Sequence, residues 1–72
     1  MNIIEQIETH LHRLGLRDID PVNSIAVYEE EPGMVRLADD HGEWIGQASV
    51  ALERLAAQET LSWEEFWELF HD

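Results

Sequence analysis

The sequence predicts an α+β fold in which an N-terminal helix precedes an antiparallel β-hairpin or three-stranded meander, and two helices follow. Three observations predict it. Apolar residues recur at helical spacing near both ends of the chain, and residues of high β-propensity fill short runs between them. All four glycines fall at the boundaries of these segments. With 72 residues and no linker-like stretch, the chain is expected to form one domain.

Residues 2 to 14 are expected to form an amphipathic helix. Asn2 can cap its first turn, and Glu5 follows three residues later, as in a capping box. Gly15 stands where a left-handed residue often ends a helix, and Leu16 comes directly after it. The apolar stripe of this helix consists of Ile3, Ile4, Ile7, Leu11 and Leu14.

A connector over residues 17 to 23 leads to the β-segments. Pro32 and Gly33 supply the φ angles that a tight turn requires, and a second turn covers residues 39 to 42. Two- and three-residue loops are both compatible with Pro32-Gly33, so the register of the hairpin stays open. The expected strands are residues 24 to 30, 34 to 38 and a short third strand at 43 to 45.

The chain returns to helical period over residues 47 to 58 and 62 to 71. Ser62 can cap the last helix, with Glu65 completing a capping box. Its aromatic stripe is most simply explained as part of the core of a small domain. We expect both helices to pack on one face of the sheet. The stripe consists of Trp63, Phe66, Trp67 and Phe70.

The charge of the chain is its most unusual feature. Sixteen Asp and Glu stand against four Arg and no Lys, which gives a formal net charge of −12. Such a field repels nucleic acid and anionic membrane surfaces and attracts basic surfaces, so direct binding to nucleic acid or membrane is not expected. The sequence has no membrane-length apolar run and no secretory signal at its start, so a cytoplasmic location is the default expectation.

No motif of the sequence predicts an enzyme, a cofactor or a metal site. There is no cysteine and no glycine-rich phosphate loop. The Asp18-Ile-Asp20 run resembles the start of a calcium loop, but Asn23 stands where that loop needs glycine. Glu68 and His71 have the Glu-x-x-His spacing of di-iron bundles, which require a second such motif that the chain lacks.

Carboxylates gather at the hairpin tip, at the second turn and along the last helix. Residues four apart on a helix rise about 6 Å, similar to the step between neighbouring phosphates of a strand, so such a row suits a groove built for a phosphate backbone. Leu69 lies off the aromatic stripe, and Trp44 is expected on an edge strand, so these two are expected to be exposed apolar anchors. The predicted partner-binding residues are Glu29, Glu30, Glu31, Asp39, Asp40, Glu43, Trp44, Glu64, Glu68 and Asp72.

These features support a non-enzymatic inhibitor that occupies the basic groove of a DNA- or RNA-handling protein, with carboxylates in place of phosphates. In size, acidity and lack of catalytic motifs the chain resembles phage-encoded anti-CRISPR and antirestriction proteins, a resemblance of composition and not of motif. The alternative is a protein-interaction module, such as an adaptor, a chaperone-like subunit or a homodimer, that binds through the aromatic stripe and Trp44. A solvated surface and adaptation to high salt remain open as further explanations of the charge.

Overall fold

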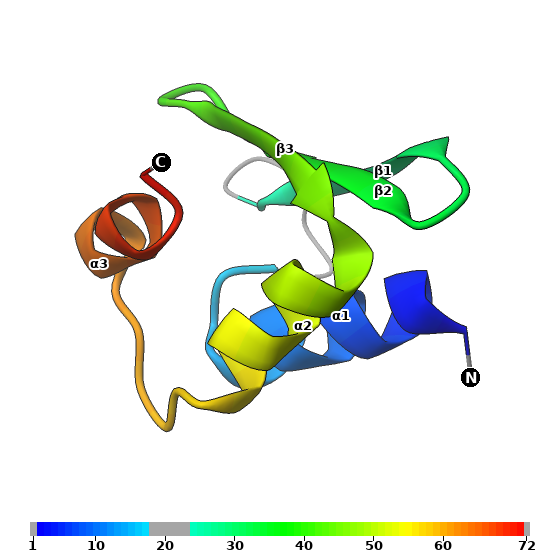
Figure 1. Cartoon of the computed structure of the whole chain (residues 1–72). Helices are drawn as coiled ribbons and strands as arrows, with labels where there is room; N and C mark the ends of the chain where they lie inside the picture. Colours follow the sequence, from blue (N-terminus) through cyan, green and yellow to red (C-terminus); the bar gives the residue numbers. More distant parts are fainter. Residues whose placement is uncertain (1, 18–23, 72) are drawn as a thin grey trace.

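The computed structural model describes residues 2–17 and 24–71 and has the predicted order of elements. Three strands form one antiparallel sheet in the order β1-β2-β3, and the three helices lie on one side of it (Figure 1). The connector beyond Arg17, with the Asp18-Ile-Asp20 run, and the terminal Asp72 lie outside the described residues. The elements are α1 (Ile3–Arg13), β1 (Ala26–Glu31), β2 (Met34–Ala38), β3 (Glu43–Gln47), α2 (Ala48–Ala56) and α3 (Trp63–Leu69).

The ends of α1 are set by the residues that predict them. The Asn2 side-chain oxygen accepts a hydrogen bond from the backbone N–H of Glu5 at 2.9 Å. At the other end Gly15 has a φ of 77°, a left-handed conformation that costs a glycine little. The Leu16 N–H donates to the Leu11 carbonyl at 2.8 Å and the Gly15 N–H to that of His12 at 3.0 Å. These two bonds form a Schellman motif.

The hairpin has a two-residue loop and a β-bulge. Gly33 has a φ of 85°, as the turn at Pro32-Gly33 requires. Glu29 pairs with Val35 and Glu31 pairs with Met34, so the register shifts between the two glutamates. The bulge leaves Glu30 without a directly paired residue. The register that the sequence leaves open is therefore set by this irregularity at the hairpin tip.

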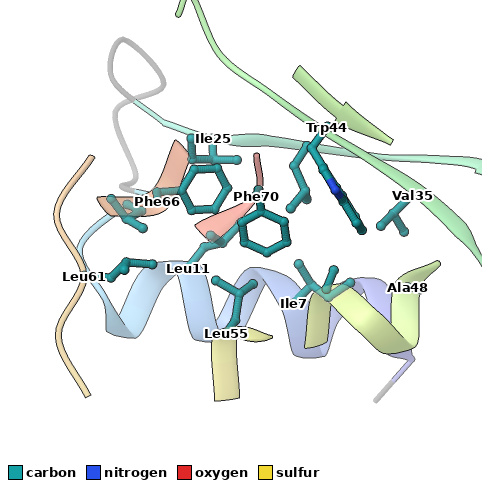
Figure 2. Close-up of a cluster of buried hydrophobic side chains, with 13 residues drawn as sticks. Ile7, Leu11, Ile25, Val35, Trp44, Ala48, Leu55, Leu61, Phe66 and Phe70 are labelled. Atoms are coloured by element: carbon teal, nitrogen blue, oxygen red, sulfur yellow. The ribbon is translucent and has the colours of Figure 1, made fainter. Parts of the chain in front are cut away.

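The core lies between the sheet and the helices. Val35 on β2 and Trp44 on β3 point toward the helices, and Phe66 of α3 and Phe70 just after it fill the space between α1 and the strands (Figure 2). Leu37, two residues after Val35 on β2, is buried as well. A core built from alternate residues of each strand is typical of a sheet covered on one face. The buried apolar residues are Ile7, Leu11, Leu16, Ile25, Val35, Leu37, Trp44, Ala48, Ala51, Leu55, Leu61, Phe66 and Phe70.

Some predicted boundaries differ from the structure. β3 continues through Gly46 to Gln47, so Gly46 lies inside a strand and not at an element boundary. α3 ends at Leu69, and Phe70 caps it outside helical geometry, whereas the sequence predicts a helix to residue 71. α2 follows β3 directly and packs mainly against α1. Within the described part of the chain, no helix has the length and apolar character needed to cross a membrane.

Candidate partner-binding surfaces

The hairpin tip, defined as Glu29, Glu30 and Glu31, is exposed. Glu29 pairs with the buried Val35, so it projects from the helix-covered side of the sheet. Glu31 pairs with Met34 on the opposite side, and Glu30 reaches the same side to contact Arg36. The bulge therefore places two of the three predicted carboxylates on one face of the sheet and the third on the other.

Arg36 stands at the centre of the sheet side that faces away from the helices, which we call the outer face. Its guanidinium forms ion pairs with Glu30 at 2.6 Å and with Glu43 at 3.3 Å. Hydrogen bonds to Glu43 and then to Glu30 raise the pKa of Arg36 above its ordinary value, because they favour the charged form. Glu43 and Glu30, both predicted to meet a partner, thus also neutralise an arginine of the same chain.

Two large apolar side chains are exposed on the outer face. Tyr28 is 47% exposed and Ile45 is 53% exposed, and both lie directly opposite Arg36 in the register of the sheet. Neither residue is among the partner-binding residues that the sequence predicts. The signal available was the adjacency of Trp44 and Ile45, because neighbouring residues of a strand point to opposite faces. Only one of the two can enter the core, and the larger one does so.

The second turn serves the fold as well as the surface. The Asp39 side chain, only 10% exposed, accepts hydrogen bonds from the backbone N–H groups of His41 at 2.7 Å and Gly42 at 3.0 Å. Its other oxygen accepts from the Trp67 indole N–H of α3 at 3.2 Å. Asp39 is thus engaged internally, whereas the predicted neighbours Asp40 and Glu43 are exposed.

The Asp39–Trp67 hydrogen bond brings two predicted acidic clusters to the same end of the molecule. Asp40 belongs to the β2–β3 turn, and Glu64 and Glu68 lie exposed on α3, which docks beside that turn. We call these three residues the turn–α3 end. It lies at the opposite end of the sheet from the hairpin tip, because the two turns of a meander are at opposite ends. Asp72, the third member of the predicted helical row, falls outside the described residues and beyond the end of α3.

The prediction that Trp44 is an exposed anchor is wrong. Its side chain is buried at 6% exposure, and its ring meets the Phe70 ring edge-on at a centroid distance of 5.0 Å. β3 is an edge strand as expected, but Trp44 faces the helices because Val35, Leu37 and Trp44 share one face. Leu69 is half-buried and packs against the same core, so it is also not a protruding anchor.

All four arginines make contacts within the fold. Arg13 donates to the Leu55 carbonyl at 3.3 Å, Arg17 to that of Ile25 at 2.8 Å, and Arg17 also pairs with Glu8 at 3.0 Å. Arg54 donates to the Leu69 carbonyl at 3.1 Å. No carboxylate of the described residues is buried, and all are exposed except the half-buried Glu8 and Asp39. Much of the negative charge therefore faces solvent without an arginine partner.

Residues 2–17 and 24–71 contain no group of three or more His, Asp or Glu side chains placed to hold a metal ion, and no buried polar side chain. Glu68 and His71 stand at a helix end, without the further carboxylates that a di-iron site requires. A scan against protein-family models and searches of curated proteins and of solved structures found no match to the chain.

Proposed function

We propose that the protein is a non-enzymatic acidic inhibitor that binds the basic nucleic-acid groove of a DNA- or RNA-handling protein. The observation that carries this proposal is the imbalance of surface charge. The arginines are engaged within the fold, while carboxylates at the hairpin tip and at the turn–α3 end project into solvent. A surface of this kind attracts clusters of Lys and Arg and repels nucleic acid itself.

The arrangement of the carboxylates supports phosphate mimicry in particular. The hairpin tip and the turn–α3 end lie at opposite ends of one three-stranded sheet, so the negative charge extends along the molecule. A basic groove that follows a nucleic-acid backbone presents its cations in a similar extended array. In this proposal the carboxylates occupy the positions of phosphates, and the protein acts in the cytoplasm on the machinery that handles nucleic acid.

Competition with nucleic acid tests the proposal directly. The immobilised chain is exposed to a cell extract in about 0.05 M NaCl, and the captured protein is eluted with duplex DNA or with structured RNA. Concentrations of the competing polyanions are compared per negative charge. We expect one of these nucleic acids to release the captured protein at a lower concentration than poly-glutamate does. Release only by salt, or equally by every polyanion, would show that the binding is a general charge effect.

The alternative is a protein-interaction module that binds through an aromatic surface. Its prediction from the sequence depends on an exposed Trp44, and the structure does not support that exposure. Trp44 is in the core, and the aromatic stripe of α3 packs inward. One specific observation still favours an apolar contribution to binding. Tyr28 and Ile45 are the exposed large apolar side chains of the described residues, and both lie on the outer face.

A further inference from the structure

A row of three side chains crosses the outer face of the sheet. Tyr28 on β1 pairs with Arg36 on β2, and Arg36 pairs with Ile45 on β3. The Arg36 guanidinium lies over the Tyr28 ring at 4.4 Å from its centroid, within the range of a cation–π contact. The helices lie on the other side of the sheet (Figure 1), and the two apolar members of the row are 47% and 53% exposed.

Carboxylates border the row on both sides. Glu30 at the hairpin tip and Glu43 at the start of β3 hold Arg36 by ion pairs, and Glu31 pairs with Met34 beside them. The one cation of this face is therefore neutralised in place, and its aliphatic stem adds to the apolar surface. The result is two exposed apolar side chains on either side of a neutralised arginine, with a negative rim of Glu30, Glu31 and Glu43.

We propose that this outer face docks onto a basic protein surface, one in which an apolar side chain stands among Arg or Lys residues. The inference rests on the proposed function, since it assigns a contact face for the same basic partner. Charge complementarity favours a cationic protein over a second copy of the chain as the partner of the outer face. Two copies of the chain, each with a formal net charge of −12, repel one another, whereas a cationic surface gains from the same rim.

The two parts of the surface contribute differently to binding. The rim steers a cationic partner and is weakened by salt, because the rim carboxylates are exposed. The Tyr28 and Ile45 side chains lose water on contact, and burial of apolar surface persists at high salt. The proposal therefore predicts a salt-resistant component of affinity that purely electrostatic mimicry lacks.

Two peptides serve as probes of this face. One is a run of arginines, and the other carries the same number of arginines interleaved with leucines. Titrations of the full chain are followed by amide chemical shifts in about 0.05 M and about 0.5 M NaCl. We expect only the arginine–leucine peptide to bind at the higher salt, with shifts concentrated on β1, β2 and β3. Ile45→Thr should lower its affinity by about fivefold and leave the all-arginine peptide unaffected.

A matched control removes charge without touching the row. Glu53 and Glu59 are exposed on and just after α2, and their double change to Gln should leave the salt-resistant binding intact. Shifts confined to the helices, equal loss of both peptides at high salt, or an unchanged affinity in Ile45→Thr would overturn the inference. So would a dimer of the chain that Ile45→Thr dissociates. Those results leave competition with DNA or RNA as the separate test of the proposed function.

Discussion

The Asp39 carboxylate joins the β2–β3 turn to α3 through hydrogen bonds from His41, Gly42 and the Trp67 indole. The indole ring also lies close over Gly42, where an added Cβ would meet it at 3.2 Å. The Asp39 side chain is only 10% exposed, and its oxygens already accept these hydrogen bonds, so it stabilises the fold and offers little surface to a partner. Of the carboxylates at the second turn, Asp40 and Glu43 therefore remain the better candidates for partner contact.

The Asp39–Trp67 bond can be tested with little loss of packing. Trp67→Phe removes the indole donor and should lower the free energy of unfolding by about 1.5 kcal/mol beyond the cost of the smaller ring, since the acceptor is charged. Trp63→Phe is the control. Trp63 is also half-buried on α3, and its indole makes no hydrogen bond within the described residues. Equal destabilisation of the two variants in urea titrations would show that the bond contributes nothing.

The inward orientation of Trp44 depends on the glycine two residues later. A Cβ at Gly46 would overlap with the Trp44 ring. We expect Gly46→Ala to lower the free energy of unfolding by about 1–3 kcal/mol, as overpacking does. The neighbouring change Ile45→Ala, on the outer face, should cost much less in the same thermal or urea denaturation. A Gly46→Ala variant as stable as wild type would contradict this arrangement of the ring.

At the level of elements, α3 shows how a short helix is held in place. It has seven residues, too few to be stable alone. The Ser62 hydroxyl accepts from the Glu65 N–H at 3.1 Å, and the Glu65 carboxylate accepts from the Ser62 N–H at 3.0 Å. Phe66, fully buried, and Phe70 then attach the helix to the core. The same helix that carries exposed carboxylates thus depends on one of them for its first turn.

The capping box predicts a specific dependence on pH. Hydrogen bonds from the Ser62 backbone N–H, and then from its side chain, lower the pKa of Glu65 in the folded state. A lowered pKa contributes stability above the unfolded pKa, and the contribution is lost as the pH falls through the folded value. At neutral pH, Glu65→Gln should therefore be less stable than Glu64→Gln, which removes the same charge from the same turn.

This difference between Glu65→Gln and Glu64→Gln should disappear as the pH is lowered below the ordinary Glu pKa of about 4.3. Thermal denaturation of both variants across this range measures it. Protonation of the other carboxylates reduces charge repulsion equally in both variants, so this general effect cancels when the two are compared. A difference that stayed constant from neutral to acidic pH would show that the Glu65 charge has no part in the cap.

Both ends of α1, the start of α3 and the order of the strands could be predicted from the sequence because their signals are local. Asn2, Gly15 and Ser62 act on backbone groups within a few residues of themselves, and all three behave as predicted. The bulge at Glu30 could not be predicted, because it depends on which residues of two strands oppose each other.

The same limit applies to the candidate site. The exposure of the hairpin tip was predictable from its charge. The burial of Trp44 and the exposure of Ile45 depend on the strand register and on the space left by Phe70 and Gly46. The internal role of Asp39 depends on Trp67, a residue 28 positions away. A contact between two residues so far apart in the chain cannot be predicted from the sequence around either of them.

For the molecule as a whole, the formal net charge of −12 opposes folding as well as directing binding. Screening should relieve this repulsion, so the free energy of unfolding should rise by about 1 kcal/mol between about 0.01 M and about 0.3 M NaCl. Urea titrations at the two salt concentrations measure the effect. A chain adapted to high salt would instead need molar salt to fold, and a decrease in stability with salt would contradict the repulsion itself.

In the proposed function, defined carboxylates, and not net charge alone, bind a basic partner. Glu29→Lys with Glu31→Lys reverses the hairpin tip and spares Glu30, which Arg36 needs. Glu53→Lys with Glu59→Lys makes the same change in net charge on and after α2.

The measurement is the affinity of each variant, by calorimetry, for the protein captured by the wild-type chain. We predict that the hairpin-tip variant loses at least about tenfold more affinity than the control variant. Equal losses would show that total charge alone drives the binding and would contradict the claim.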